Sequence, residues 1–376
     1  MIVFVLAVLF MSPTAVPLPE PDSVRVAVFN VWELSREKLD TEDHRQLRAA
    51  AEVVQRVRPE VLLINEIDYD AAGENARLFV KRFLREPQNG QSPIDYPHVY
   101  VAPVNTGLPS GLDLNRDGES DGPDDAWGFG RYPGQYGMAL LSQVPIDTQR
   151  VRTFQKLRWV SMPGHHMPDG RDGRPAWYEP AIADQLRLSS KSHWDVPILL
   201  GSGNVLHVIA AHPTPPVFDD GQQDRNGRRN FDEIRLIADY VAGGERAAWI
   251  IDDHGEKGGL SADQSFVILG DLNADPGNDV IYDETVAIDQ LLDHPRVRDT
   301  KPVGAGGAYA RRGSFFSDDR LYTANYGRLD YALPSKDLTI TGSGIFWPGP
   351  GEPLRHLVDG DDKASDHMLV WVDIDR

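Results

Sequence analysis

The segment 266–276 constrains the fold more than any other part of the chain. Four apolar residues, 266–269, predict a buried strand that ends at Gly270 and at two polar residues, Asp271 and Asn273. Side chains at positions i and i+2 of a strand point the same way, so Asp271 and Asn273 can reach one point in space. Such a pair suits the base and the hydrogen-bond donor of a hydrolytic site. The alternative is a turn at the strand exit.

Composition excludes several classes of protein. The formal net charge of -19 argues against a broad basic surface for binding nucleic acid. An acidic site can still act on phosphate esters, because bound divalent cations reverse its local charge. The chain has no cysteine, which excludes disulfides, thiolate nucleophiles and cysteine zinc sites.

The N-terminal segment has the composition of an export signal. Residues 1–11 are apolar, too few to span a bilayer, and a stretch rich in small residues and proline follows. We expect a signal peptide and linker over 1–22, a single domain over 23–376 and a secreted or periplasmic monomer with no stable membrane span. The alternatives are an uncleaved N-terminal anchor and a misassigned start.

The pattern of elements predicts one α/β domain. Strands are predicted at 24–29, 61–66, 137–141, 205–211, 266–269, 329–333 and 368–372, and helices at 47–57, 74–83 and 230–241. Long loops are predicted at 102–136 and 155–196. Because strands and helices alternate irregularly, we expect two packed mixed sheets with helices outside.

Polar side chains recur at the ends of the predicted strands. They are Asn30, Glu66, His212, Asp271 with Asn273, and Asp366 with His367, while Asp330 lies inside the strand at 329–333. Each of them alone could be a cap or a satisfied loop residue. Their repetition favours one shared site, and the oxygen ligands of Glu66 and Asp366 suit Mg²⁺, Mn²⁺ or Ca²⁺ better than zinc.

This series of residues resembles the endonuclease/exonuclease/phosphatase superfamily. The segments that carry the resemblance are Asn30, Asn65-Glu66, His212, Gly270-Asp271-Leu272-Asn273, Asp330-Tyr331 and Ser365-Asp366-His367. They occur in the expected order from about residue 24 to residue 374. The resemblance implies a four-layer α/β sandwich, with two packed mixed sheets flanked by helices.

The resemblance also implies a role for each of these residues. Glu66, with Asn30 beside it and Asp366 in the same shell, would hold a catalytic Mg²⁺ or Mn²⁺. Asp271 would orient or deprotonate the attacking water, and Asn273 would donate to a phosphate oxygen. His367 would contact the phosphate with Asp330 as its carboxylate partner, and His212 would protonate the leaving group or bind the phosphate.

A basic turn departs from the family pattern after His212. Arg225, Arg228 and Arg229 could bind a substrate phosphate, because guanidinium groups match phosphate oxygens. The alternative is a solvated helix start with Asn230 as its N-cap.

Aromatic residues are frequent in the predicted loop 155–196. Trp159, Trp177 and Tyr178 could stack on a substrate, or they could form a hydrophobic cluster that pins the loop. At the end of this loop, Lys191 and His193 are candidate phosphate contacts.

A second segment matches a calcium-binding loop. Its candidate ligands are Asp113, Asn115, Asp117, Glu119 and Asp124, with Gly118 at the sharp turn. We expect a structural Ca²⁺ here; the alternative is a solvated turn rich in aspartate and glycine.

Together these patterns predict an exported, divalent-metal-dependent phosphoesterase. Its expected substrates are phosphodiesters, whether nucleic acid, a lipid or a small organic diester. The alternatives are a phosphomonoesterase acting on sugar or inositol phosphates and a non-catalytic binding module with a vestigial site.

Overall fold

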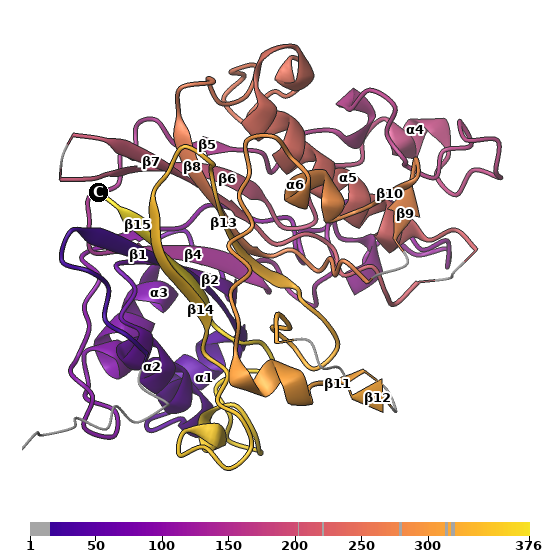
Figure 1. Ribbon diagram of the computed structural model, residues 1–376. Helices are drawn as coiled ribbons and strands as arrows, with labels where there is room; N and C mark the ends of the chain where they lie inside the picture. Colours follow the sequence, from indigo (N-terminus) through magenta and orange to yellow (C-terminus); the bar gives the residue numbers. More distant parts are fainter. Residues whose placement is uncertain (1–15, 202, 220–221, 278–279, 313–314, 317–319) are drawn as a thin grey trace, which may run out of the picture.

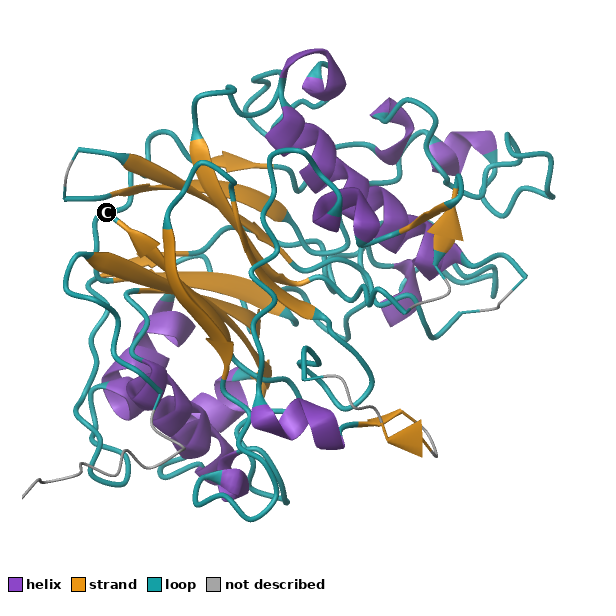
Figure 2. Cartoon of the chain, viewed as in Figure 1, coloured by secondary structure: helices purple, strands orange, loops and turns teal. Residues whose placement is uncertain are grey.

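Two mixed β-sheets pack face to face, and helices cover their outer faces (Figures 1 and 2). The computed structural model describes residues 16–376 except 202, 220–221, 278–279, 313–314 and 317–319. The expected α/β sandwich of two packed mixed sheets flanked by helices is confirmed. Of the predicted signal segment, residues 1–15 lie outside the described part. Val16 packs against the hydrophobic core.

The first sheet has six strands in the order β14-β15-β1-β2-β4-β3. Their bounds are β1 Ser23–Leu34, β2 Val61–Ile67, β3 His98–Tyr100, β4 Gly137–Ser142, β14 Ile340–Ile345 and β15 Val370–Asp375. Strands β1 and β2 are parallel, and every other pair is antiparallel. The carboxyl ends of β1 and β2 therefore meet at one edge of this sheet.

The second sheet repeats this arrangement with five strands in the order β13-β8-β7-β6-β5. Their bounds are β5 Arg152–Thr153, β6 His193–Leu199, β7 Val205–Ala211, β8 Ser265–Asp271 and β13 Asp330–Pro334. Strands β7 and β8 form its parallel pair. Two short hairpins lie outside the sheets: β9 Ile281–Tyr282 with β10 Thr285–Val286, and β11 Arg311–Arg312 with β12 Phe315–Phe316.

The helices divide between the two outer faces (Figure 1). The first sheet is covered by α1 Arg36–Asp40, α2 Arg45–Val57, α3 Glu74–Phe79 and the π-helical turn Val80–Leu84. On the side of the second sheet lie α4 Pro180–Ala183, α5 Arg225–Ala242 and α6 Asp289–Leu292. Short 3₁₀ turns occupy Pro123–Asp125, Trp159–Ser161, Gly244–Ala247, Ala305–Tyr309 and Arg355–Leu357.

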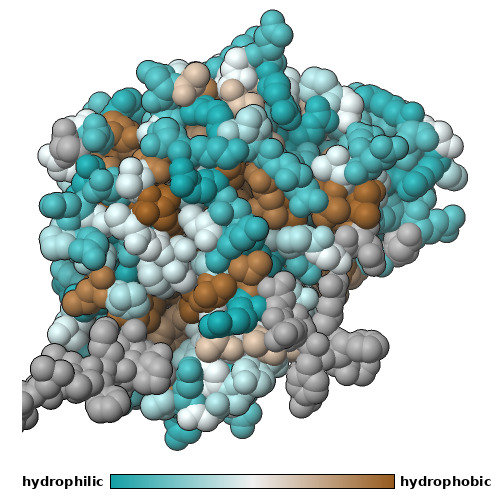
Figure 3. Space-filling model, viewed as in Figure 1, coloured by the Kyte–Doolittle hydropathy of each residue, from teal (hydrophilic) through white to brown (hydrophobic). Residues whose placement is uncertain are grey.

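Successive side chains of β8 point alternately into the two hydrophobic clusters of the core. Val267 and Leu269 belong to the cluster between the sheets, whereas Phe266 and Ile268 belong to the cluster beneath α5. This is the period of two that a strand imposes on its side chains. On the face seen in Figure 3, hydrophobic residues form separate patches among hydrophilic ones. Within the described residues, no helix is long and apolar enough to cross a membrane.

Gly270 is required where β8 passes β7. A Cβ at this position would lie 2.3 Å from the carbonyl oxygen of Ala211, a contact that no side chain could accommodate without moving backbone. The glycine therefore permits the close strand packing that delivers Asp271 to the edge of the sheet.

Two predicted boundaries were wrong. Helix α5 begins at Arg225 rather than Asn230, and Asp224 occupies the N-cap position without a side-chain capping hydrogen bond. Asn230 lies inside the helix, where its amide donates to the carbonyl oxygens of Thr214 and Leu272 instead of capping. The predicted loop 155–196 includes the start of β6, whose side chains are buried by partners distant in sequence.

A buried ion pair joins the first and last strands of the first sheet. Arg25 Nε lies 2.7 Å from Asp373 Oδ1, and its Nη2 lies 2.8 Å from Oδ2. We predict that Asp373→Ala lowers the free energy of unfolding by about 3–5 kcal/mol, because it leaves a buried guanidinium unpaired. Urea unfolding measures this. Asp40→Ala, which breaks the exposed pair with Arg36, is the control and should change little; equal losses in the two variants would contradict the prediction.

Candidate active site

The strand topology brings the polar strand ends to one place. The carboxyl ends of β1 and β2 carry Asn30 and Glu66, and those of β7 and β8 lead to His212 and Asp271. Two antiparallel strands begin at the same edge: Asp330 opens β13 directly opposite Asp271, and His367 precedes β15. The residues that the sequence placed at strand ends therefore lie around one edge of the two packed sheets. This edge is called the mouth of the sandwich below.

Asp271 is a buried carboxylate at the centre of this site. Its Oδ2 accepts a hydrogen bond from Asn30 Nδ2 at 2.9 Å and lies 3.4 Å from His212 Nε2. Its Oδ1 accepts from the backbone N–H of Asn273. Burial opposes ionisation, but the charge of His367 and these hydrogen bonds hold the pKa of Asp271 below its ordinary value of 3.8. Asp271 is therefore ionised at neutral pH and can accept a proton.

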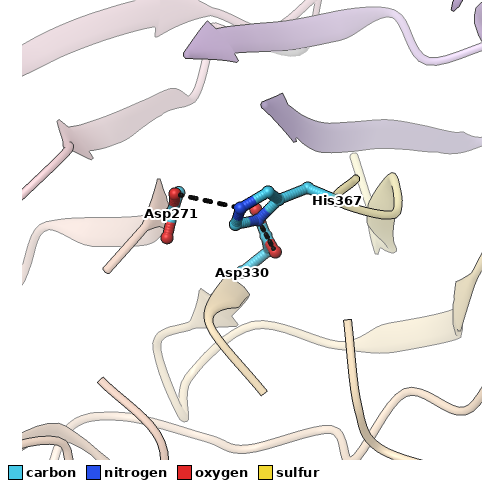
Figure 4. Close-up of side chains that lie close together, drawn as sticks. All are labelled: Asp271, Asp330 and His367. Atoms are coloured by element: carbon cyan, nitrogen blue, oxygen red, sulfur yellow. Dashed lines mark hydrogen bonds and ion pairs between the residues drawn. The ribbon is translucent and has the colours of Figure 1, made fainter. Parts of the chain in front are cut away.

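His367 lies between two carboxylates, as Figure 4 shows. Its Nδ1 is 2.8 Å from Asp330 Oδ2, and its Nε2 is 3.8 Å from Asp271 Oδ2. Burial alone would lower the pKa of His367, yet Asp330 and Asp271 hold it well above 6.5. Burial raises the pKa of Asp330 to about 6 against the opposing charge of His367. His367 is thus a cation fixed in orientation by Asp330.

His212 and Lys191 lie close to each other and to Asp271. Lys191 is buried and donates to the carbonyl oxygen of Pro213 at 3.3 Å, one residue beyond His212. Burial and the nearby charge of Lys191 lower the pKa of His212, so this imidazole is neutral near pH 7. His193 is held by a hydrogen bond between its Nδ1 and Ser189 Oγ, and burial lowers its pKa to about 4. Lys191 therefore lies beside the site, whereas His193 is a neutral buried residue.

Asn30 links the carboxylates of Glu66 and Asp271. Its amide nitrogen lies 3.0 Å from Glu66 Oε1 and 2.9 Å from Asp271 Oδ2. Its Oδ1 accepts the backbone N–H of Trp32. With its carbonyl oxygen used in this way, Asn30 positions the carboxylates more readily than it ligates a metal.

The backbone is strained around Glu66. Left-handed φ values, which non-glycine residues rarely adopt, occur at Trp32, Glu33, Glu66, Tyr136 and Asn273. Both β1 and β2 change register beyond Asn30 and Asn65. Such strain persists where the surrounding structure over-determines it, and it clusters at functional sites.

The donor atoms of this site fit a divalent cation. Within the described residues, one group of three side chains has ligand atoms within 4.8 Å of one another: Asp271, Asp330 and His367. A protonated His367 has no lone pair to offer a metal ion, so the carboxylates are the candidate ligands. Glu66 and Asp366 are only partly buried, and both act electrostatically on Lys38 and on Tyr326. Both acids therefore face the same mouth, and this excess of carboxylate oxygens suits Mg²⁺ or Mn²⁺.

The arginines of the basic turn make other contacts. Arg225 stacks on Trp177 with 4.4 Å between its guanidinium carbon and the ring centre. Arg228 is buried and pairs with Asp172 at 2.8 Å, and Arg229 donates to four backbone carbonyl groups. The structure therefore does not bring Arg228 and Arg229 to Asp271; they tie α5 to the loops around it.

The aromatic residues of the 155–196 segment pin that segment to the core. Trp159 and Tyr178 belong to the cluster beneath α5. Trp159 Nε1 donates to the buried carboxylate of Asp232 at 2.6 Å, and Trp177 Nε1 donates to the carbonyl oxygen of Leu114. This confirms the hydrophobic-cluster interpretation over a substrate-stacking rim.

The predicted calcium loop forms a turn stabilised by its own backbone. Asp113 accepts from the N–H groups of Arg116 and Gly118, and Asp117 accepts from that of Glu119. Asp124 lies in the 3₁₀ turn that follows. The metal-ligating group found among the described residues does not include this loop, and Ca²⁺ binding there stays a prediction.

Two residues near the centre were missed from the sequence. The hydroxyl of Tyr326 lies 3.2 Å from His367 Nε2, and Lys38 is surrounded by Glu33, Glu66 and Asp366. Neither residue stands at a predicted strand end. Their positions follow from tertiary packing, for which the sequence offers no signal.

Comparison with known proteins places this fold and site in a family. No curated protein matches the chain. Among solved structures, an endonuclease/exonuclease/phosphatase from Beutenbergia cavernae is 16% identical, with 94% of this chain and 72% of that chain covered and a TM-score of 0.52. The human Nocturnin catalytic domain is 12% identical, with 95% and 96% covered and a TM-score of 0.47.

A beta toxin variant from Staphylococcus aureus with bound magnesium ions is 14% identical, with 93% of this chain and 99% of that chain covered and a TM-score of 0.47. The model of the Endonuclease/Exonuclease/phosphatase family matches residues 27–367, which include every strand-end residue described above. The chain therefore belongs to the Endonuclease/Exonuclease/phosphatase family.

Proposed function

We propose that this chain is a divalent-metal-dependent phosphodiesterase that hydrolyses P–O bonds by direct attack of water. The observation that carries the proposal is the ionised, buried Asp271 in contact with Asn30 and His212 and close to the cationic His367. A base, a fixed cation and a neutral imidazole around one point are the groups that in-line attack on phosphorus requires. Export to a secreted or periplasmic location is part of the proposal and rests on the sequence of residues 1–22.

Each side chain then has one task in the reaction. Asp271 takes a proton from the attacking water. His367, held by Asp330, neutralises a phosphate oxygen, and Asn273 donates to another. His212 faces Asp271 through Nε2, from which a hydrogen can be donated to the leaving oxygen.

Glu66 and Asp366 would hold the divalent cation, with Asn30 fixing the orientation of Glu66. The cation, when bound, supplies positive charge that stabilises the negative charge on the phosphate as it develops. Without it, several carboxylates face one another at the mouth. These residues would repel a phosphate anion, which explains the need for a metal.

Two observations favour a diester over a monoester. A dianionic monoester needs additional cations nearby, and the guanidinium groups of Arg228 and Arg229 are engaged elsewhere. Trp32 and Tyr326, which are 41% and 50% exposed, offer apolar surface beside the acidic residues for an ester substituent. Phosphomonoesterase activity is the second candidate. The net charge of -19 disfavours long duplex DNA as the substrate.

The test is hydrolysis of bis-p-nitrophenyl phosphate against p-nitrophenyl phosphate, with Mg²⁺, Mn²⁺, Ca²⁺ or EDTA, beside a plasmid-nicking assay. We expect faster turnover of the diester, dependent on Mg²⁺ or Mn²⁺ and abolished by EDTA. Nicking would identify nucleic acid as a substrate. Preference for the monoester would replace the proposal with a phosphatase, and no turnover of either ester would reject it.

Asp271→Asn should lower kcat by about 100-fold or more, because the amide cannot accept the proton. The substitution keeps the size of the side chain and an oxygen that can accept from Asn30, so folding should be retained. The matched control is Asp252→Asn, which alters a buried carboxylate paired with Arg152 at the far edge of the second sheet. Turnover by folded Asp271→Asn within about threefold of wild type would remove Asp271 from the mechanism.

Glu66→Gln should weaken Mn²⁺ binding, because it removes a charged oxygen ligand from the proposed site. Isothermal titration calorimetry measures this affinity, and Glu60→Gln is the control, since Glu60 pairs with Arg376 at the opposite end of the sheet. Unchanged Mn²⁺ affinity in Glu66→Gln would place the metal elsewhere.

A further inference from the structure

Tyr326 lies on a turn that is fastened to both members of the His367–Asp330 pair. Ala324 forms β-bridges with Gly327 and with His367. Thr323 Oγ1 accepts hydrogen bonds from the backbone N–H groups of Leu329 and Asp330, at 2.9 and 3.0 Å. The turn therefore has a fixed position relative to the catalytic groups, and so does the tyrosine at its tip.

The hydroxyl of Tyr326 faces the atom of His367 that points into the site. His367 uses Nδ1 for Asp330, and its Nε2 lies 3.2 Å from Tyr326 Oη. A phenol hydroxyl at this distance can accept a hydrogen bond from Nε2 and still donate its own hydrogen to another group. Among the described residues, no further hydrogen-bond partner is found for this hydroxyl.

The surroundings of this hydroxyl are anionic. Asp366, Asp271, Asp330 and Glu66 all act on Tyr326, and burial together with these charges raises its pKa well above 10. The phenol therefore keeps its hydrogen at neutral pH and can act as a donor. A neutral donor is the type of group that stabilises a phosphate oxygen without adding charge.

The ring of Tyr326 has a different environment from its hydroxyl. It is 50% exposed, and it meets the His367 ring edge-on, with centroids 6.1 Å apart at 84°. Part of this aromatic residue is therefore open to solvent beside His367. A flat or apolar ester substituent can pack on an exposed aromatic ring.

We propose that Tyr326 is a catalytic residue that contacts the substrate twice: its hydroxyl donates to a non-bridging phosphate oxygen, and its ring packs against the retained ester group. This inference rests on the proposed phosphodiesterase function and deepens it. It assigns to the site phosphodiesters whose retained substituent is aromatic or apolar, in preference to those with a small substituent.

Two substitutions separate the two contacts. Tyr326→Phe removes the hydroxyl and keeps the ring, and we expect it to lower kcat by about 10- to 100-fold with little change in KM, because the donor acts mainly in the transition state. Tyr326→Ala removes the ring as well. Besides lowering kcat, this variant should raise KM for bis-p-nitrophenyl phosphate by at least about fivefold. Its KM for methyl p-nitrophenyl phosphate should stay within about twofold of the wild-type value.

The two esters share a leaving group and differ in the retained group, so the comparison isolates contact with the ring. Tyr309→Phe, at another exposed tyrosine, is the control and should behave as wild type. Calorimetric binding of inorganic phosphate in the presence of Mg²⁺ gives a readout that does not depend on turnover, and Tyr326→Phe should weaken it.

The outcomes distinguish this inference from the proposed function. Active wild type with unchanged kcat and phosphate affinity in Tyr326→Phe would overturn the hydroxyl contact alone. Equal changes in KM for both esters in Tyr326→Ala would overturn the ring contact and indicate a structural role. A wild-type chain that turns over neither ester would overturn the proposed function and this inference together.

Discussion

The site depends on one amide group that two carboxylates share. Asn30 Nδ2 donates to Glu66 and to Asp271, and so joins β1 and β2 of one sheet to β8 of the other. Two acids held this close repel each other, and a donor between them reduces that repulsion. Because Asn30 Oδ1 also holds the strained backbone of Trp32, a single side chain sets the distance between the proposed metal-binding and proton-accepting groups.

The sandwich explains why these residues meet. Each sheet contains one parallel pair, β1 with β2 and β7 with β8, and the carboxyl ends of both pairs lie at the same edge. The antiparallel strands β13 and β15 run the other way, so their first residues join the same edge. Buried side chains there are paired with one another: Asp330 with His367, and Asp271 with Asn30 and His212. Packing thus gives His367 its charge and its orientation before any substrate arrives.

Much of this arrangement could be predicted from the sequence. The features that could not be predicted depend on contacts between residues that meet only in the folded chain. The strands that end in Asn30, Glu66 and Asp271 combine an apolar run with an abrupt polar end, and that local signal is strong. Strand β6 was missed at His193 because its burial depends on β5 and β7. Arg229 was a candidate for phosphate binding because sequence shows its charge but not the carbonyl groups that surround it. No sequence pattern indicated Tyr326 as a site residue, because its contact with His367 forms only in the folded chain.

We propose that water attacks phosphorus directly at Asp271, with no covalent enzyme intermediate. The most direct measurement is the stereochemical course of hydrolysis of a phosphorothioate diester that is chiral at phosphorus, in ¹⁸O-labelled water with Mg²⁺. One displacement inverts the configuration at phosphorus, so we expect inversion. Retention would reveal two displacements and a nucleophile from the protein, and would contradict the role given to Asp271.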